Sequence, residues 1–193
     1  MIPMRGEIHQ DFDLIALHAA LEARRTALAL SWADVGRALG VSAGTLRTLG
    51  TRPRAEGDGV LRMIAWLDDS PESFVPGRLH SAGAMPLPSP ARALRFDARA
   101  LYAALDVKRS ACGLTWQQVA ADAGVGGAGA LTRLRAGGRV MFPEVMRVLA
   151  WLGAPVAQFV QVVATEPPPN KQLLQTPHTQ EVGAHVLRHG RQS

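Results

Sequence analysis

Apolar residues recur at helical spacing from the beginning of the chain. Between residues 12 and 28 they fall mostly three or four positions apart, at Phe12, Ile15, Ala16, Ala19, Ala20 and Ala23. Such spacing places them on one face of an α-helix. The pattern therefore predicts a first amphipathic helix over residues 12–28.

Short polar residues indicate where the next helices begin. Ser31 and Asp34 have the spacing of a capping box, in which each side chain accepts a hydrogen bond from the other residue's backbone N–H. Gly40 is expected to end this second helix, because glycine tolerates the left-handed conformation. Ser42 then caps a third helix that runs through Leu46.

Two further helices complete the pattern. Asp58 or Gly59 opens a helix that continues through Trp66, and Ser70 precedes a short helix that ends at Phe74. No segment shows the alternation of apolar and polar residues that is typical of a half-buried strand. The predicted fold class is therefore all-α.

The whole pattern occurs twice. Phe12 aligns with Phe96, 84 residues later, and one residue is inserted in the second copy after Val125. All four tryptophans fall into matched pairs: Trp32 with Trp116, and Trp66 with Trp151. This period exceeds the roughly 20–50 residues of stacked repeats, so each copy is predicted to be a small domain of about five helices.

The second copy repeats the helix signals with different residues. Thr115 and Gln118 form the second capping-box pattern. Pro143 stands in the first turn of the predicted fourth helix, where its missing N–H has no cost.

The duplication divides the chain into five segments: an N-terminal tail (1–11), a first copy (12–75), a linker (76–95), a second copy (96–163) and a C-terminal tail (164–193). The linker is rich in Pro, Gly and Ser, which is typical of a flexible connection. A slack linker would permit either a direct or an inverted arrangement of the two copies. The proline-rich C-terminal tail is expected to be partly disordered.

Charge and composition narrow the class of protein. The formal net charge is +5 and the sequence pI is about 10.6, which favours an anionic partner. The first copy carries −1, whereas the linker and the second copy carry +3 each. Residues 1–7 lack the charged and apolar stretches of a secretory signal, no apolar run is long enough for a membrane helix, and the single cysteine excludes an internal disulfide. A cytoplasmic protein without membrane association is expected.

Residues 30–46 (LSWADVGRALGVSAGTL) and 114–125 (LTWQQVAADAGV) carry a resemblance to a known family. Two helices joined by a tight Gly-Val turn are similar to the helix-turn-helix of the Cro/lambda-repressor-like (XRE) family. The Leu-Ser-Trp start and the later Ala-Trp-Leu resemble small actinobacterial regulators in particular. The resemblance covers roughly two thirds of the chain and implies two lambda-repressor-like domains that bind double-stranded DNA.

In this family the third helix enters the major groove, and the start of the second helix faces a phosphate. Carried over, the first copy would contact DNA through Ser31, Ser42, Ala43, Thr45, Arg47, Thr48, Arg52 and Arg54. The second copy would do so through Thr115, Gln117, Gly126, Gly127, Thr132, Arg133, Arg135 and Arg139.

Two departures from the family pattern bear on this interface. Trp32 and Trp116 stand where the family often has a phosphate-clamping glutamine. These tryptophans pack on a neighbouring helix, lie against DNA sugars or join the two domains; the sequence leaves the three options open. Gly126 and Gly127 open the third helix of the second copy and carry no base-reading group, so base reading there falls mainly to Thr132 and Arg133 or is weak.

Catalysis and metal binding find little support in the sequence. His178, His185 and His189 cluster in the tail without a cysteine or an acidic partner, so we expect no metal site and no cofactor. The Gly-rich run 124–129 lacks a preceding strand and the Gly-Lys-Ser/Thr end of a phosphate loop. We expect that the protein is not an enzyme.

Two hypotheses for function remain. The first is a transcriptional regulator that binds adjacent half-sites through both copies. The second is a protein-interaction module on a repressor-like fold, an anti-activator or adaptor, favoured by the −1 charge of the first copy and the glycines of the second. The C-terminal tail is a possible contact for a protein partner, and the sequence leaves open whether the chain acts as a two-domain monomer or a homodimer.

Overall fold

A computed structural model describes residues 11–77 and 92–164 of the chain. The first copy contains four α-helices: α1 (Leu14–Ala27), α2 (Trp32–Leu39), α3 (Ala43–Arg47) and α4 (Gly57–Leu67). Between and after them lie the 3₁₀ turns η1 (Leu49–Thr51) and η2 (Pro71–Phe74), together with the short strand β1 (Ala55–Glu56). This order matches the helices that the hydrophobic pattern predicts.

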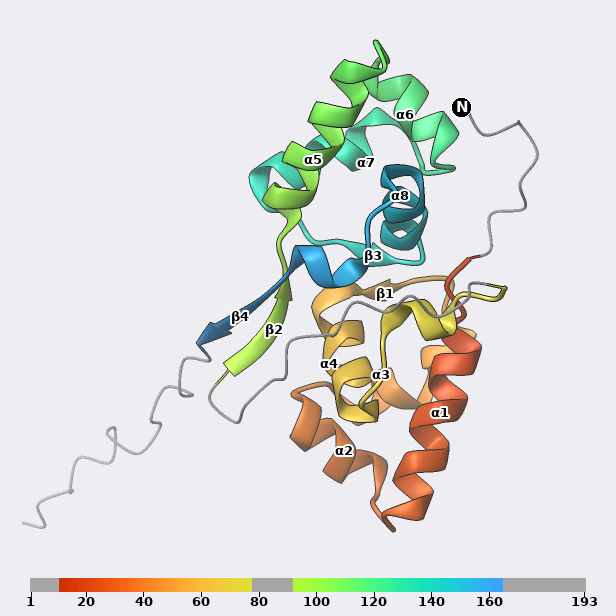
Figure 1. The fold of residues 1–193 in the computed structure, drawn as a ribbon. Coiled ribbons are helices and arrows are strands. Elements are labelled where there is room, and N and C mark those ends of the chain that lie inside the picture. Colours follow the sequence, from red (N-terminus) through yellow and green to blue (C-terminus); the bar gives the residue numbers. More distant parts are fainter. Residues whose placement is uncertain (1–10, 78–91, 165–193) are drawn as a thin grey trace, which may run out of the picture.

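The second copy repeats the order of elements. Its helices are α5 (Ala98–Ala111), α6 (Trp116–Asp122), α7 (Ala128–Thr132) and α8 (Glu144–Leu152), with 3₁₀ turns η3 (Arg133–Ala136) and η4 (Val156–Phe159). Its strands are β2 (Arg92–Phe96), β3 (Met141–Phe142) and β4 (Val160–Ala164). The described residues are thus mostly helical (Figure 1).

The expectation that the chain contains no strand is wrong. β1 pairs with β3, and β2 pairs with β4, both antiparallel. Arg92–Phe96 includes four residues that we expected in a flexible linker, and its five residues pair in register with Val160–Ala164. β1 and β3 are only two residues long, too short to show an alternating pattern in the sequence.

The helix signals in the sequence are confirmed where they rest on side-chain capping. Ser31 with Asp34, and Thr115 with Gln118, both form complete capping boxes. Gly40 ends α2 in the left-handed conformation, with φ of 62°. Pro143 lies one position earlier than predicted, as the residue that precedes α8.

Each copy encloses a core built from equivalent side chains. Many positions are buried in both copies, among them Leu17 and Leu101, Leu21 and Leu105, Val35 and Val119, Leu46 and Leu131, Leu49 and Leu134, Val60 and Val145, Ile64 and Leu149. Polar contacts repeat as well, since the Arg25 guanidinium donates to the Leu30 carbonyl (2.7 Å) and that of Arg109 to the Leu114 carbonyl (2.8 Å). The duplication in the sequence is therefore a duplication of packing.

The two copies meet at the β1–β3 ladder (Figure 1). Glu56 lies opposite Met141, its own equivalent in the second copy. On one side Ala55 pairs with Phe142, and on the other the Gly57 N–H donates to the Val140 carbonyl at 2.9 Å. An antiparallel ladder in which a residue faces its own equivalent has a local two-fold axis between the strands. The copies are thus related here as the subunits of a symmetric dimer are.

Apolar packing reinforces this junction. The fully buried ring of Phe142 lies edge-on to Phe12 of the first copy, with ring centroids 4.7 Å apart. Gly57, the equivalent of Phe142, must remain small because a Cβ atom there would lie 2.3 Å from a Val140 methyl carbon. The two sides of the junction are therefore complementary rather than identical.

Polar side chains also join the copies. The buried carboxylate of Glu72 accepts a hydrogen bond from the Val156 N–H at 2.9 Å. Asp58 at the start of α4 accepts from the Phe96 N–H at 3.0 Å, next to a 3.9 Å ion pair with Arg95. These contacts fix the end of the expected linker against the first copy. A slack tether does not describe the arrangement of the two copies.

Candidate nucleic-acid interface

In the first copy, α2 and α3 are joined by a tight turn. The Val41 N–H donates to the Gly36 carbonyl at 2.9 Å, and the Ser42 hydroxyl caps α3 by accepting from the Thr45 N–H at 3.0 Å. A Cβ atom on Gly36 would lie 2.5 Å from the Val41 carbonyl oxygen. The close approach of α2 to the turn therefore depends on glycine at this position.

The second copy forms the same turn between α6 and α7 by a different route. The Val125 N–H donates to the Ala120 carbonyl at 2.9 Å, which repeats the bond of the first copy. Gly127 then precedes α7 with φ of 104° and ψ of 170°, and α7 has no side-chain cap. This backbone region is essentially restricted to glycine, which explains a glycine at that position.

The predicted DNA-contact residues lie mostly on the surface. Ala43, Thr45 and Gly127 are half-buried. The others are exposed: Ser31, Ser42, Arg47, Thr48, Arg52, Arg54, Thr115, Gln117, Gly126, Thr132, Arg133, Arg135 and Arg139. Arg133 and Arg135 lie in η3, after the end of α7.

Several of these side chains are held by local hydrogen bonds. The Thr48 hydroxyl donates to the Gly44 carbonyl at 2.9 Å and accepts from Arg52 Nε at 3.0 Å. The Ser42 and Thr45 hydroxyl oxygens are 2.8 Å apart. The polar groups at the two ends of α3 are therefore positioned before any partner binds.

The arginines of this surface differ in how they are neutralised. Arg54 lies 3.6 Å from a carboxylate oxygen of Glu144, across the junction between the copies. The ion pairs found among residues 11–77 and 92–164 do not include Arg47, Arg52, Arg133, Arg135 or Arg139. These five cations are able to meet an anionic partner without first breaking an ion pair of that part of the chain.

Charge also stabilises the start of α2. The Ser31 hydroxyl and backbone N–H both donate to the Asp34 carboxylate, and Arg37 lies 3.1 Å from it. Hydrogen bonding to Ser31, above all from its side chain, lowers the pKa of Asp34 below that of an ordinary aspartate. In the second copy Gln118 makes the equivalent bonds without a charge.

Trp32 and Trp116 pack within their own copies. Trp32 stacks on His18 with ring centroids 5.6 Å apart, and Trp116 stacks on Tyr102 at 4.9 Å. The guanidinium of Arg25 lies over the first indole and that of Arg109 over the second. Of the three options that the sequence left open, these contacts are those of packing on a neighbouring helix.

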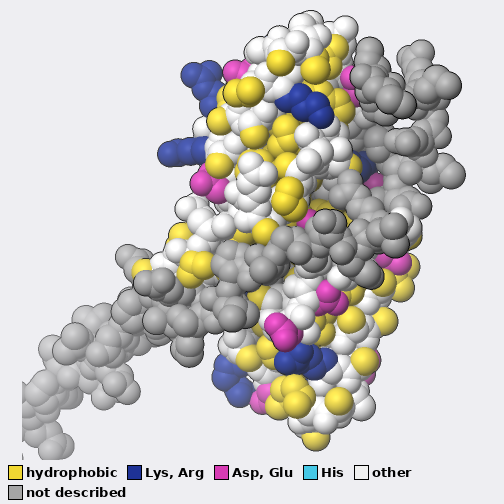
Figure 2. All heavy atoms as spheres, viewed as in Figure 1, with side chains coloured by type: hydrophobic (Ala, Val, Ile, Leu, Met, Phe, Trp, Pro, Cys, Tyr) yellow, Lys and Arg dark blue, Asp and Glu magenta, His cyan; other side chains and the backbone are white. Residues whose placement is uncertain are grey.

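The face of the molecule seen in Figure 2 carries lysine and arginine side chains scattered among acidic and apolar ones, without one dominant charged patch. No group of three or more histidine, cysteine or acidic side chains suited to a metal occurs within residues 11–77 and 92–164. His178, His185 and His189 lie outside the described residues, as does most of the C-terminal tail.

None of the described helices combines the length and apolarity needed to cross a membrane.

Comparisons with protein-family models, with curated proteins and with solved structures each found no match to this chain.

Proposed function

We propose that this chain is a sequence-specific DNA-binding regulator of the Cro/lambda-repressor-like type, with two helix-turn-helix domains that bind adjacent half-sites. The observation that carries the proposal is the pairing of Glu56 with Met141, which relates the α2–α3 unit to the α6–α7 unit by a local two-fold axis. A two-fold rotation keeps equivalent helices at the same height along the axis. The two third helices, α3 and α7, are thus expected on one side of the molecule.

The symmetry leads to a prediction about the DNA sequence. Repressor dimers place two recognition helices about one DNA turn apart, roughly 34 Å, and the dyad of the protein coincides with that of the operator. A single chain with an internal two-fold axis would match inverted half-sites, not direct repeats. The half-sites should differ in sequence, because α3 has the sequence AGTLR and α7 has AGALT.

Phosphate contacts are expected to come from the unneutralised arginines. Arg47, Arg52, Arg133, Arg135 and Arg139 are all exposed and follow or end the two third helices. Each phosphate neutralised contributes about 0.9 to the slope of log affinity against log salt concentration. Five contacts of this kind would give a slope of about −4 to −5.

The experiment begins with selection of bound duplexes from a random pool by the full chain. Fluorescence anisotropy then compares the selected site with a version in which one half-site is reversed. We expect the inverted arrangement to bind more tightly, and the affinity to fall steeply with salt. Equal affinity for both arrangements would show that the two domains do not read DNA as a fixed pair.

A double substitution tests the residues. Arg47→Ala with Arg133→Ala should weaken binding of the selected site by at least about tenfold, since one good base or phosphate contact contributes about 1–3 kcal/mol. Arg24→Ala with Arg99→Ala is the matched control, because it removes the same charge from two exposed arginines outside the proposed interface. An equal loss in both variants would indicate an effect of net charge alone.

A protein-interaction module is the second candidate. It is favoured by α7, which begins after two glycines, has no side-chain cap and contains no charged residue. On this alternative, no duplex would be enriched by selection, and the Arg47→Ala and Arg133→Ala variants would keep their function.

A further inference from the structure

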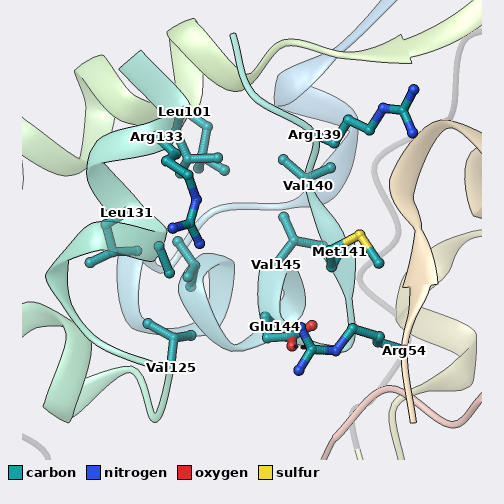
Figure 3. Close-up of a pocket in the computed structure, with 14 residues that line it drawn as sticks. Arg54, Leu101, Val125, Leu131, Arg133, Arg139, Val140, Met141, Glu144 and Val145 are labelled. Atoms are coloured by element: carbon teal, nitrogen blue, oxygen red, sulfur yellow. Dashed lines mark ion pairs between the residues drawn. The ribbon is translucent and has the colours of Figure 1, made fainter. Parts of the chain in front are cut away.

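A cavity of about 310 Å³ lies inside the second copy, under α7 (Figure 3). Its walls come from α5, α7, η3, β3 and α8, and Arg54 reaches it from the first copy. The apolar part of the lining includes Leu101, Val125, Leu131, Leu134, Val145 and Val148. Small-molecule sites have volumes from about 300 Å³ upwards and are lined mostly by apolar side chains with a few polar groups.

The polar groups of the cavity are few and specific. Figure 3 shows the Arg133 guanidinium directed into the space between α7 and α8, whereas the head of Arg139 points away from it. Arg54 and Glu144 lie together at another side of the cavity and form an ion pair of 3.6 Å. Since that pair neutralises itself, Arg133 leaves the interior with an excess of positive charge.

Glu144 gives a second indication that the cavity binds a ligand. Its Oε2 atom is buried and has no hydrogen-bond partner among the described residues. A buried carboxylate oxygen without a donor is unfavourable, because it has lost its hydrogen bonds to water. A bound molecule with an O–H or N–H group would remove this cost.

The equivalent place in the first copy is already filled by a carboxylate. There Glu56 caps α4, and its oxygens accept from the N–H groups of Asp58 (3.2 Å) and Gly59 (2.9 Å). Met141 stands at the equivalent position of the second copy, and α8 has no side-chain cap. The second copy therefore has the Glu144 carboxylate in the first turn of α8 but lacks the capping hydrogen bonds that Glu56 makes in the first copy.

We propose that this cavity binds a small carboxylic acid with an apolar body and a hydroxyl group. The carboxylate pairs with Arg133, the apolar body packs against the leucines and valines, and the hydroxyl donates to Glu144 Oε2. Two features together select this class: one cation faces the interior, and one buried acceptor lacks a donor.

Binding of the acid has a consequence that rests on the proposed function. Arg133 is also a proposed DNA contact. A carboxylate that pairs with Arg133 makes this cation unavailable to the duplex. The acid and DNA would then weaken each other's binding by the same factor, because coupling between two sites is reciprocal. A factor of about 5 to 150 is typical of such coupling.

The test measures binding to the full chain by calorimetry, without DNA, so that it does not depend on DNA recognition. Three acids of the proposed class serve as probes: 4-hydroxyphenylacetate, 3-hydroxyoctanoate and salicylate. Phenylacetate lacks the donor, and 4-hydroxyphenylacetamide lacks the charge. We expect one site with a Kd of about 1 mM or lower for at least one probe. We expect a loss of at least about tenfold for the uncharged analogue and a smaller loss for phenylacetate.

Two variants locate the site. Arg133→Gln removes the cation from an exposed side chain and should weaken the acid at least about tenfold, with no change for the amide. Ala130→Trp fills the cavity from α7 and should abolish binding of both. Equal affinity of the acid and its amide, no saturable binding of any probe, or unchanged binding by Arg133→Gln would each overturn the proposal. If the acids bind but do not weaken binding of a selected duplex, the site stands and only the coupling fails.

Discussion

Substitution of Phe142 by alanine tests whether the two copies form one cooperative unit. Phe142 is fully buried in β3, and its ring lies edge-on to Phe12 across the junction. Truncation of a buried phenylalanine to alanine lowers the free energy of unfolding by about 3–5 kcal/mol. The loss of the edge-to-face pair with Phe12 accounts for about 0.5–1.5 kcal/mol within this value.

This loss is large relative to the total free energy of unfolding of a domain. A domain is stable by about 5–15 kcal/mol, so Phe142→Ala would remove about a fifth or more of that stability. With a dependence on urea of about 2 kcal/mol per molar, the midpoint should fall by roughly 2 M. Phe142→Leu keeps most of the apolar volume, so its urea midpoint should fall by less. It provides a folded variant if the alanine variant does not fold.

Tryptophan fluorescence can follow each copy separately. Replacing Trp116 and Trp151 by Phe leaves reporters only in the first copy, and replacing Trp32 and Trp66 leaves them only in the second. We expect both reporters to unfold at one urea midpoint, and Phe142→Ala to lower that midpoint in both. A shift confined to the reporters of the second copy would refute the reasoning, because it would mean that the copies unfold independently.

Three further predictions concern local structure and pH. Ser31→Ala and Thr115→Ala should each lower the free energy of unfolding by about 1 kcal/mol, since each removes the cap of one helix; urea unfolding checks this, with Ser110→Ala, an exposed serine, as the control. Gly127→Ala should destabilise by about 1–3 kcal/mol because φ is 104°, whereas Gly126→Ala should be tolerated, because it has neither a positive φ nor a neighbouring atom within 4 Å. The lowered pKa of Asp34 implies that its contribution to stability is complete above the pKa of an unfolded aspartate and is lost as pH falls through the lower folded pKa. Asp34→Asn should therefore flatten the pH dependence of unfolding in this acidic range, while Gln118→Ala in the second copy should leave it unchanged. An identical pH profile for Asp34→Asn and the parent chain would count against a stabilising role of the charged Ser31–Asp34 capping box.

Local signals in the sequence were sufficient for the helices. The capping boxes at Ser31 and Thr115 and the glycine after α2 act through hydrogen bonds between residues three or four positions apart. The buried leucines and valines recur at helical spacing, so the core of each copy follows from periodicity. The exposure of Arg47 and Arg133 agrees with the surface positions that the resemblance implies.

The junction and the cavity could not be predicted in this way. A two-residue strand has no period, and the partner of Glu56 lies 85 positions away, at Met141. The cavity is lined by residues from several elements and by the Arg54–Glu144 ion pair, whose two members belong to different copies. Neither the junction nor the cavity can be recognised in a short segment of the sequence.

The order of residues alone placed each helix to within a residue or two, indicated which side chains enter each core, and showed that one pattern is present twice. These are short-range properties, because capping and helical periodicity act within one or two turns. Only the tertiary structure decided that the copies pair around a two-fold axis, that the end of the supposed linker is a strand, and that a cavity opens in the second copy. Those features arise from contacts between distant segments, whose register is set by the complementarity of surfaces that exist only after each copy has folded.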